Sequence, residues 1–407
     1  MHLKNIKEST SLSSFVYMQL VVSAIVIGMV VGVVDTIFGR TLLWLGEVRS
    51  QYFSYLIPFL GLAGLLIVYL YQRFGGKANQ GMDLVFKVGH EEENEIPLRL
   101  IPLVTVTTWL THLFGGSAGR EGVAVQLGAT LSHYLSRYVN VPNKSQFFLL
   151  TGMAAGFAGL FQTPMAAVFF AAEVLVVGRL ALTAIAPVVV ASFTSAWTSH
   201  GLGLEKFAVP IKKSLDMTPE SFVKLVILGI CFGLCGNLFA YLLGKGKKWA
   251  AKQFENPYWR IGILGLVASV LFLALHLGRY TGLGTNLISA SFTGGQIYSY
   301  DWLLKLLLTV ITLSAGYQGG EVTPLFAMGA SLGVALSGLI GLPMELVAAL
   351  GYASVFGSAT NTFLAPIFIG GEVFGFANTP AFFIVCGIAY ALNRQNSIYG
   401  GQKVELS

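Results

Sequence analysis

The chain has 407 residues, of which 55% are hydrophobic and only 11% are charged. Soluble globular proteins carry charge on about a quarter of their residues, so the composition excludes an ordinary soluble protein. Long apolar runs also exclude a transmembrane β-barrel, whose strands alternate polar and apolar residues. The formal net charge of +6 comes from basic residues in a few short loops, as the positive-inside rule describes. We therefore expect an all-α polytopic protein of the lipid bilayer, with no nucleic-acid partner.

The chain opens with a polar segment at 1–14, which is expected in the cytoplasm. The apolar run at 15–38 is too long for the hydrophobic part of a cleaved signal peptide, so it predicts the first membrane helix. A polar loop with Arg40, Glu47 and Arg49 is expected next, followed by a helix at about 54–72 and a charged segment at 73–99. After it come apolar pieces at about 98–114, 121–138, 147–160, 164–177 and 181–199.

A loop at 201–217 leads to a long predicted helix at about 218–243 and then to the most basic loop, at 245–260, which is also expected in the cytoplasm. Further apolar pieces lie at about 261–277, 285–293, 302–315, 321–340, 344–357, 363–377 and 380–393. Many pieces are shorter than the roughly 20 residues of a clean crossing. Short helices broken by Gly and Pro are typical of transporters with a site near the membrane midplane. We expect no soluble C-terminal domain in the last segment, 396–407.

An internal repeat divides the chain. Residues 152–174 align with 351–373 without a gap, with eight of 23 positions identical. The segment Gly119-Arg120-Glu121 aligns in the same way with Gly319-Gly320-Glu321. The sequence therefore predicts two related membrane repeats, at 15–200 and 218–395, that meet at a shared site.

The stretch from Gly115 to Val123 contains four glycines, Arg120 and Glu121, just before an apolar helical run. Glycine-rich backbone at a helix start points N–H groups and the positive helix end at one spot, which suits an anion. The Glu121 carboxylate is a tethered anion that competes for that spot and that a proton can neutralise. A structural alternative is that the glycines serve close helix packing and that Glu121 is an N-terminal cap with Arg120 as its partner.

The motif Gly119-Arg120-Glu121-Gly122 resembles the signature of the CLC family of anion channels and proton-coupled anion antiporters. The segment 319–324 resembles the second glycine motif of that family, and 79–84 falls where the family has Gly-Ser-Gly-Ile-Pro. Tyr399 falls where a late tyrosine faces the central anion. The resemblance implies two inverted-topology repeats with broken helices, a homodimer with one pathway in each subunit, and a multi-pass protein of the cell membrane. The implied anion-binding residues are Gly81, Met82, Gly119, Arg120, Gly122, Val322, Thr323 and Tyr399.

At several positions the sequence departs from the usual CLC motifs, and these departures resemble one branch of the family. Met82 replaces the usual serine, Glu321 replaces an apolar residue, and Val322 and Thr323 replace a phenylalanine and a small residue. This pattern is similar to the fluoride-exporting branch, the CLC-F fluoride/proton antiporters. It implies export of fluoride from the cytoplasm in exchange for protons, with Glu121 as the gating glutamate. The alternative is a chloride-type CLC exchanger or a passive anion channel.

The proton path departs from the family pattern as well. Many CLC antiporters carry a second proton glutamate in a Glu-Glu pair, but the corresponding stretch here reads Ala172-Glu173-Val174. Glu321 is our candidate for a second proton or gate role, and a structural role as a helix-start carboxylate stays open beside it. Glu173 and Glu372 occupy equivalent repeat positions, which favours a structural role at loose helix ends.

Enzymatic and metal-dependent functions find no support in the sequence. There is no His-Glu-x-x-His, no Gly-x-Gly-Asp and no nucleophile clustered with histidines. The three cysteines, Cys231, Cys235 and Cys386, lie in apolar runs and are best interpreted as small core residues. We expect no enzyme activity, no cofactor and no metal site.

Overall fold

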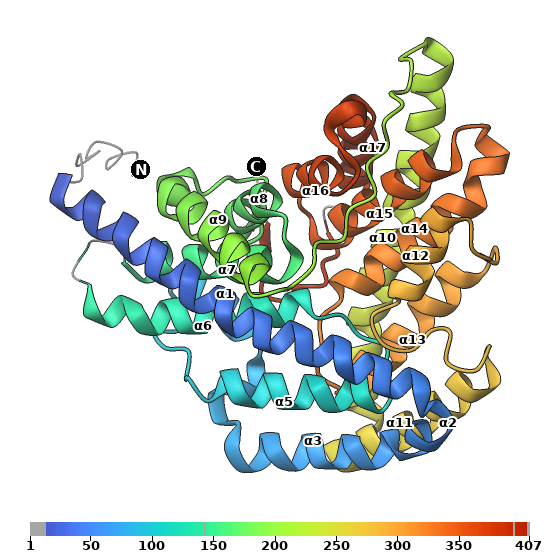
Figure 1. Ribbon diagram of the computed structural model, residues 1–407. Coiled ribbons are helices and arrows are strands. Elements are labelled where there is room, and N and C mark those ends of the chain that lie inside the picture. The colour runs from blue at the N-terminus through green and yellow to red at the C-terminus, as the bar shows by residue number, and fades with distance from the viewer. Residues whose placement is uncertain (1–13, 140, 142–143, 394, 405–407) are drawn as a thin grey trace, which may run out of the picture.

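A long N-terminal helix, α1 (Ser14–Gln51), crosses over the helices that follow it and packs against α5, α6, α7 and α9 (Figure 1). The computed structural model describes residues 14–139, 141, 144–393 and 395–404. The predicted cytoplasmic segment at 1–14 lies outside the described residues except for Ser14, and the last three residues of the segment 396–407 also lie outside them.

Most of the described chain is helical. Up to residue 201 the further helices are α2 (Phe53–Leu56), α3 (Leu60–Phe74), α4 (Met82–Gly89), α5 (Leu100–Leu113), α6 (Glu121–Leu135), α7 (Lys144–Phe161), α8 (Pro164–Glu173) and α9 (Ile185–Gly201). The later helices are α10 (Pro219–Gln253), α11 (Pro257–Ala274), α12 (Thr285–Thr293), α13 (Asp301–Ala315), α14 (Val322–Ile340), α15 (Met344–Thr360), α16 (Leu364–Phe374) and α17 (Thr379–Leu392). Short 3₁₀ turns, η1 (Ile57–Phe59), η2 (Gly76–Gln80), η3 (Ser136–Tyr138), η4 (Leu182–Ala184) and η5 (Phe376–Asn378), connect several of them.

Two predicted helices were too short. The polar loop expected around Arg40 and Arg49 is the continuation of α1, and the basic loop expected from residue 245 is the end of α10, which runs to Gln253. Lysine, arginine and glutamate are good helix formers. Their long stems also cover apolar surface while the charge stays in the polar zone. The apolar run of each helix therefore stops at charged residues, while the helix itself continues.

The breaks in the short helices fall at equivalent places in the two repeats. Gln162 precedes α8 with φ 62°, and Asn361 precedes α16 with φ 51°. These positions differ by 199, the offset of the sequence repeat. Positive φ is uncommon for residues other than glycine, so the same unusual conformation at both positions supports two related repeats.

Glycines allow the same close helix crossing in each repeat. A Cβ added at Gly128 would lie 2.1 Å from the carbonyl oxygen of Gly152, where α6 crosses α7. A Cβ added at Gly329 would lie 2.1 Å from the carbonyl oxygen of Gly351, where α14 crosses α15. Small residues at such crossings let two backbones touch inside a membrane.

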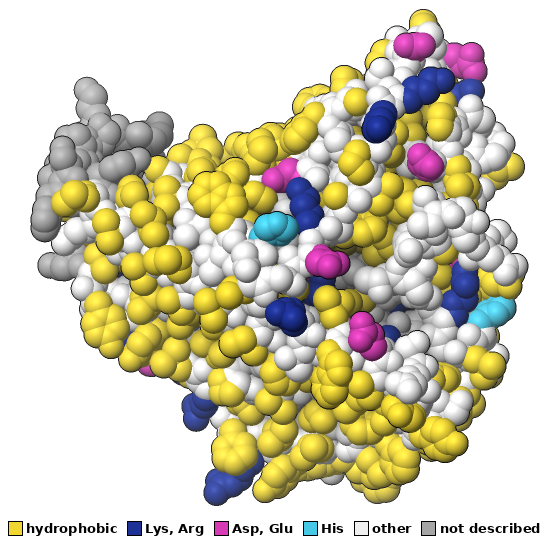
Figure 2. All heavy atoms as spheres, in the orientation of Figure 1, with side chains coloured by type: hydrophobic (Ala, Val, Ile, Leu, Met, Phe, Trp, Pro, Cys, Tyr) yellow, Lys and Arg dark blue, Asp and Glu magenta, His cyan; other side chains and the backbone are white. Residues whose placement is uncertain are grey.

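The surface fits a lipid environment. Six helices in the described part of the chain are long and apolar enough to cross a membrane. Hydrophobic side chains cover broad areas of the face shown in Figure 2. Large apolar side chains such as Trp44 and Trp197 are 59% and 70% exposed, which is expected where lipid replaces water.

The C-terminal segment packs beside the end of α8 through a strand pairing that the sequence did not predict. The strand β2 (Lys403–Val404) pairs in parallel with β1 (Val176–Val177), directly after α8. Gln402 Nε2 also donates to the carbonyl oxygens of Val174 and Thr360, both at 2.9 Å. These bonds hold the nearby Tyr399 in the interior, where its side chain is 4% exposed.

Candidate functional site

The two glycine-rich segments, one before α6 and one before α14, meet directly. Gly119 N–H donates to the carbonyl oxygen of Gly320 at 2.5 Å, and Gly320 N–H donates back to Gly119 at 2.8 Å. A Cβ at Gly119 would lie 3.0 Å from that Gly320 oxygen, and Gly319 has φ 153°. Only small residues allow this contact. The helix starts of both repeats therefore face one point.

Glu121 extends from the start of α6 to the start of α14. Its Oε2 accepts hydrogen bonds from Thr323 Oγ1 at 2.5 Å and from Thr323 N–H at 3.2 Å. The side chain of Glu121 is 1% exposed. Thr323 lies in the first turn of α14, where free N–H groups and the helix dipole favour a negative group. The carboxylate thus occupies a position that fits a small anion.

Arg120 supplies a positive charge beside this carboxylate. Its Nε lies 3.6 Å from Glu121 Oε1, and its backbone N–H donates to Glu121 Oε2 at 3.3 Å. The guanidinium is largely buried, and within the described residues its Nε and Nη1 have no hydrogen-bond partner. The ion pair is therefore loose enough for Glu121 to leave without breaking a close bidentate contact.

A cavity of about 180 Å³, named here the Tyr399 cavity, opens beside Glu121. It is lined by residues 79–83, Gly122, Gln126, Lys247, Leu313, residues 316–321, Ile398 and Tyr399. Four of the predicted anion-site positions, Gly81, Met82, Gly122 and Tyr399, are therefore brought together on one cavity wall. Tyr399 Oη and Gln126 Oε1 are buried and have no partner among the described residues, so the cavity offers polar groups that a ligand can satisfy.

Glu321 lies at the N-cap of α14 and lines the same cavity, with its side chain 13% exposed. Lys247 of α10 also lines this cavity, with its Nζ 3.6 Å from Glu321 Oε1. The lysine side chain is 48% exposed. Val322 is buried beside them and 1% exposed, so its side chain is core while its backbone belongs to the helix start. The cavity therefore has a charged pair at its wall that sequence reasoning identified only on the glutamate side.

A second cavity of about 640 Å³, the Arg49 cavity, shares no lining residue with the Tyr399 cavity. Its wall includes Arg49, His112, the turn 276–279 and residues 281 and 283–286, together with residues of α1. Arg49 Nη1 donates to the carbonyl oxygen of His112 at 3.0 Å. His112 Nε2 lies 3.3 Å from the carbonyl oxygen of Gly119. Contacts from this cavity thus reach a residue two positions before Glu121, while Gly122 lines the Tyr399 cavity.

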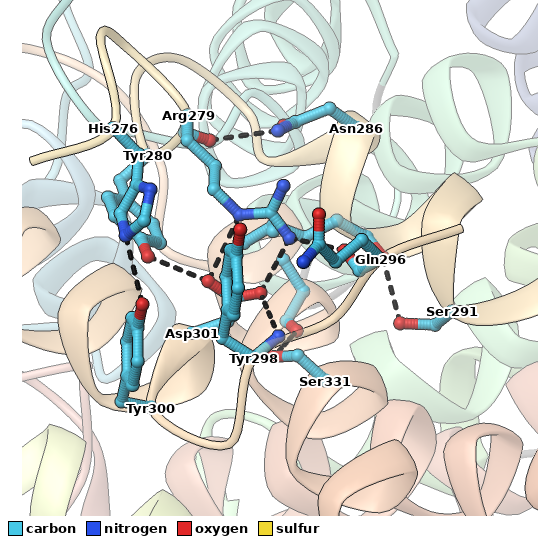
Figure 3. Close-up of polar contacts among 12 residues, drawn as sticks. His276, Arg279, Tyr280, Asn286, Ser291, Gln296, Tyr298, Tyr300, Asp301 and Ser331 are labelled. Carbon is cyan, nitrogen blue, oxygen red and sulfur yellow. Dashed lines mark hydrogen bonds and ion pairs between the residues drawn. The ribbon is translucent and has the colours of Figure 1, made fainter. Parts of the chain in front are cut away.

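The rim of the Arg49 cavity is a loop held by Asp301, as Figure 3 shows. The buried Asp301 carboxylate accepts bonds from Arg279 Nε and Nη2 at 3.0 and 2.6 Å and from Tyr280 Oη at 2.7 Å. His276 has φ 55°, stacks on Tyr298 with ring centroids 5.0 Å apart, and contacts Tyr300 Oη at 3.0 Å. A bidentate arginine pair of this kind fixes geometry as well as adding energy. The rim is therefore a rigid element.

Lys305 holds the first glycine-rich segment in place through a hydrogen bond to Ser117. This lysine is fully buried in α13, and its Nζ donates to Ser117 Oγ at 2.8 Å, to Gly282 O at 2.7 Å and to Tyr280 O at 3.1 Å. Three acceptors match the three protons of an ammonium group. Sequence reasoning missed Lys305, although a lysine inside the apolar run 302–315 is a recognisable signal.

A family model described as voltage gated chloride channel matches residues 63–394. The chain belongs to the CLC family. A crystal structure of a CLC-type fluoride/proton antiporter is 57% identical, covers 97% of this chain and 100% of its own, and superposes with a TM-score of 0.95. A chloride/fluoride channel protein of Pseudomonas syringae pv. tomato is 35% identical over 357 residues, which are 86% of this chain and 79% of the relative.

An X-ray structure of a slow cyanobacterial Cl⁻/H⁺ antiporter is 20% identical to this CLC chain and shares its fold. The match has a TM-score of 0.80 and covers 92% of this chain and 94% of the other. The predicted fold class, a helical membrane protein of the CLC type, is thereby confirmed. The resemblance to the fluoride-exporting branch is confirmed by the 57% identical structure.

Glu173 and Glu372, at equivalent positions of this CLC chain, each reach across to a helix start of the other repeat. Glu173 accepts bonds from the N–H groups of Phe363 and Leu364 before and at the start of α16, at 2.5 and 2.8 Å. Glu372 accepts bonds from Met165 and Ala166 at the start of α8, at 3.1 and 2.9 Å. Each carboxylate satisfies N–H groups that a helix start leaves free.

The residue after Glu173 has no proton chemistry. Val174 stands where many CLC antiporters carry a second glutamate, and its side chain is completely buried. The other residues that sequence reasoning missed, Gln126 and Lys247, both line the Tyr399 cavity. Gln126 is the polar side chain one turn beyond Gly122 on α6, which is a usable signal. Lys247 lay in the predicted basic loop, and only the extension of α10 brings it to the site.

Proposed function

We propose that this CLC protein exports fluoride from the cytoplasm in exchange for protons, with Glu121 as the group that couples the two fluxes. The observation that carries the proposal is the bond pair from Thr323 to Glu121 Oε2. A carboxylate already sits on the donors that a small anion needs. The likeness to a CLC-type fluoride/proton antiporter supports fluoride as the ion.

Competition for one set of donors explains the coupling. Ionised Glu121 accepts hydrogen bonds from the N–H and O–H groups of Thr323 and so blocks the anion site. A proton removes its charge, so its bonds to the α14 helix start and to Arg120 weaken and the side chain leaves. Fluoride from the Tyr399 cavity then takes the donors, while the displaced carboxyl holds the proton that it received from the Arg49 cavity and later releases it toward the Tyr399 cavity. One group thus alternates between holding the site and holding a proton.

The donor set fits fluoride. Fluoride is small and strongly hydrated, so a site must supply several hydrogen-bond donors at short range to replace its water. Thr323 N–H and O–H supply two, and the unpartnered Tyr399 hydroxyl at the adjoining cavity supplies a third. Gly81 and Gly122 leave room at this place, since an added Cβ would lie 3.4 Å and 3.5 Å from its nearest neighbour. Met82 lies on the same cavity wall, where many CLC proteins have a serine hydroxyl that suits chloride.

Glu321 is the proposed second proton or gate residue, since Val174 removes the usual one. It faces the Tyr399 cavity and has Lys247 as a loose partner. Lys247 keeps Glu321 from repelling an approaching anion when the glutamate is ionised. When fluoride displaces Glu321 from the lysine, the glutamate is free to take a proton.

The proposal also includes an orientation of the protein in the membrane. A cytoplasmic N-terminus places the start of α1 inside and its far end, with Arg49, outside. The Tyr399 cavity is then the inner mouth and the Arg49 cavity the outer one. We propose further that the protein lies in the cell membrane as a homodimer, in which each subunit has its own pathway and the repeats span 15–200 and 218–395.

A passive anion channel is the second candidate, because one relative is named a chloride/fluoride channel protein. Liposomes that contain the purified protein separate the two. They are loaded with fluoride or chloride, and anion efflux is recorded beside internal pH. Fluoride efflux that moves protons uphill, with little chloride moved, is the expected result. Anion flux without protons would establish a channel, and chloride efflux as fast as fluoride efflux would establish a chloride-type exchanger.

A further inference from the structure

The wall of the Tyr399 cavity contains a buried hydrogen-bond acceptor that the exchange of fluoride for protons has not yet used. Gln126 of α6 lines this cavity and is 8% exposed. Its Oε1 has no hydrogen-bond partner within the described residues. A buried polar atom without a partner costs free energy, so such an atom at a cavity wall favours a ligand that can satisfy it.

The orientation of the Gln126 side-chain amide is fixed by its own helix. Its Nε2 donates to the carbonyl oxygen of Gly122 at 3.4 Å. A carbonyl oxygen can only accept hydrogen bonds, so the amide nitrogen must face Gly122 and the amide oxygen must face away from it. Gly81 leaves room on that side, because a Cβ added at this glycine would lie 3.4 Å from Gln126 Oε1. The unpartnered oxygen is therefore the atom that a ligand can reach.

An amide oxygen distinguishes between the two ions of the exchange. It carries a partial negative charge and only lone pairs, so it repels fluoride and attracts a group that carries a proton. Water fits this description, and the cavity volume of about 180 Å³ has room for several water molecules. The Tyr399 hydroxyl and the Glu321 carboxyl line the same cavity and provide further polar partners for such water. The Gln126 oxygen therefore suits the proton and not the anion.

Gly122 brings this acceptor close to the groups that hold protons in the proposed exchange. It follows Glu121 directly in the chain, and its carbonyl oxygen anchors the Gln126 amide. A Cβ added at Gly122 would also lie 3.8 Å from Glu321 Oε2. Gln126 and Glu321 thus approach the same glycine and face the same cavity. A water molecule on Gln126 Oε1 is therefore well placed to receive a proton from the Glu321 side of the cavity.

We propose that Gln126 Oε1 holds a water molecule that takes up the proton leaving the site, and that the same oxygen keeps fluoride away from this position. The inference rests on the proposed exchange of fluoride for protons and adds a group to its inner proton step. The O–H bond of the Glu321 carboxyl breaks, a carboxylate remains, and the water becomes hydronium, which passes its extra proton to cytoplasmic water. Gln126 itself neither gains nor loses a proton, so it is a positioning residue.

Gln126→Leu tests the proposal, because leucine has a similar volume and no acceptor. Proton flux and fluoride efflux are recorded in the same liposomes. The proton-to-fluoride ratio should fall about tenfold, as for the loss of one hydrogen bond to a charged group, because the anion keeps its own donors. Fluoride binding, measured by calorimetry on the purified protein, should stay within about twofold of the wild type. Gln126→Glu, which retains an acceptor oxygen, should restore the proton flux. Gln72→Leu, at an exposed glutamine of α3, is the control and should leave both fluxes unchanged.

Three other outcomes would overturn the proposal. An unchanged ratio in Gln126→Leu with lower thermal stability would leave Gln126 with a packing role only. A large loss of fluoride affinity with an unchanged ratio would place Gln126 among the anion ligands. A wild type that moves fluoride without protons would overturn the proposed function together with this inference, whereas a coupled wild type beside a fully coupled Gln126→Leu would overturn the inference alone. Gln126→Met, which also lacks the amide oxygen, gives the same comparison if the leucine variant does not fold.

Discussion

Thr323 Oγ1 lies 2.5 Å from Glu121 Oε2, although 202 positions separate the two residues in the chain. The bond joins the start of α6 to the start of α14, where Glu121 is buried. Each repeat supplies one member of the contact.

Glu121→Gln should abolish proton movement coupled to fluoride efflux. The glutamine side chain has nearly the same shape as that of glutamate, but its amide cannot take up or release a proton near neutral pH. The measurement is internal pH beside fluoride efflux in liposomes. Glu345→Gln is the matched control, since Glu345 is an exposed glutamate in the first turn of α15. Full proton coupling in Glu121→Gln would end the gating role.

Thr323→Val should raise the fluoride concentration that gives half-maximal efflux. The valine keeps the shape and the backbone N–H but removes the hydroxyl donor. A hydrogen bond to a charged group contributes about 1.5–3 kcal/mol, so the expected change is roughly tenfold to hundredfold. Thr323→Ser, which retains the hydroxyl, should stay close to the wild type. Equal behaviour of the valine and serine variants would show that the hydroxyl does not contact the ion.

Met82→Ser should reduce the discrimination against chloride. The substitution adds a hydroxyl to the wall of the Tyr399 cavity, at the place where many CLC proteins carry one. The ratio of fluoride to chloride efflux, measured in the same liposome preparation, should fall. Met82→Leu, which adds no donor, is the control. Unchanged selectivity in Met82→Ser would remove this position from the filter.

Glu321→Gln tests the second proton step. If Glu321 passes protons to the Tyr399 cavity, proton flux should fall more than fluoride flux. Lys247→Gln should act differently, because it removes a partially exposed cation and should slow fluoride entry in a salt-dependent way. Glu321→Gln with intact proton movement would leave this residue with a structural role at the start of α14.

Glu173→Gln and Glu372→Gln should lower stability and leave the proton-to-fluoride ratio unchanged. Each substitution replaces a carboxylate that accepts backbone N–H groups at a helix start of the other repeat. The expected cost is about 1.5–3 kcal/mol for each lost charged hydrogen bond. Thermal unfolding of the solubilised protein measures it. A selective loss of proton flux in Glu173→Gln would instead make Glu173 part of the proton path.

The sequence was sufficient for the membrane class, the repeat and the order of most helices, but it missed α4 (Met82–Gly89), which lies within the predicted charged segment 73–99. These depend on local properties, namely the length of apolar runs, glycine and proline breaks, and motifs such as 119–122. Most predicted helices begin and end within a few residues of those in the structure. The ends of α1 and α10 were wrong because charged side chains do not stop a helix that leaves the apolar layer.

Only the tertiary structure decided which distant groups meet. Nothing local to Thr323 indicates that its hydroxyl donates to Glu121. Lys247 reaches Glu321 only because α10 continues beyond its apolar part. Such contacts depend on how helices from both repeats cross, and the crossings depend on close packing over the whole core. The sequence by itself therefore determined the elements and the candidate chemistry, while packing determined the partners of each charged group.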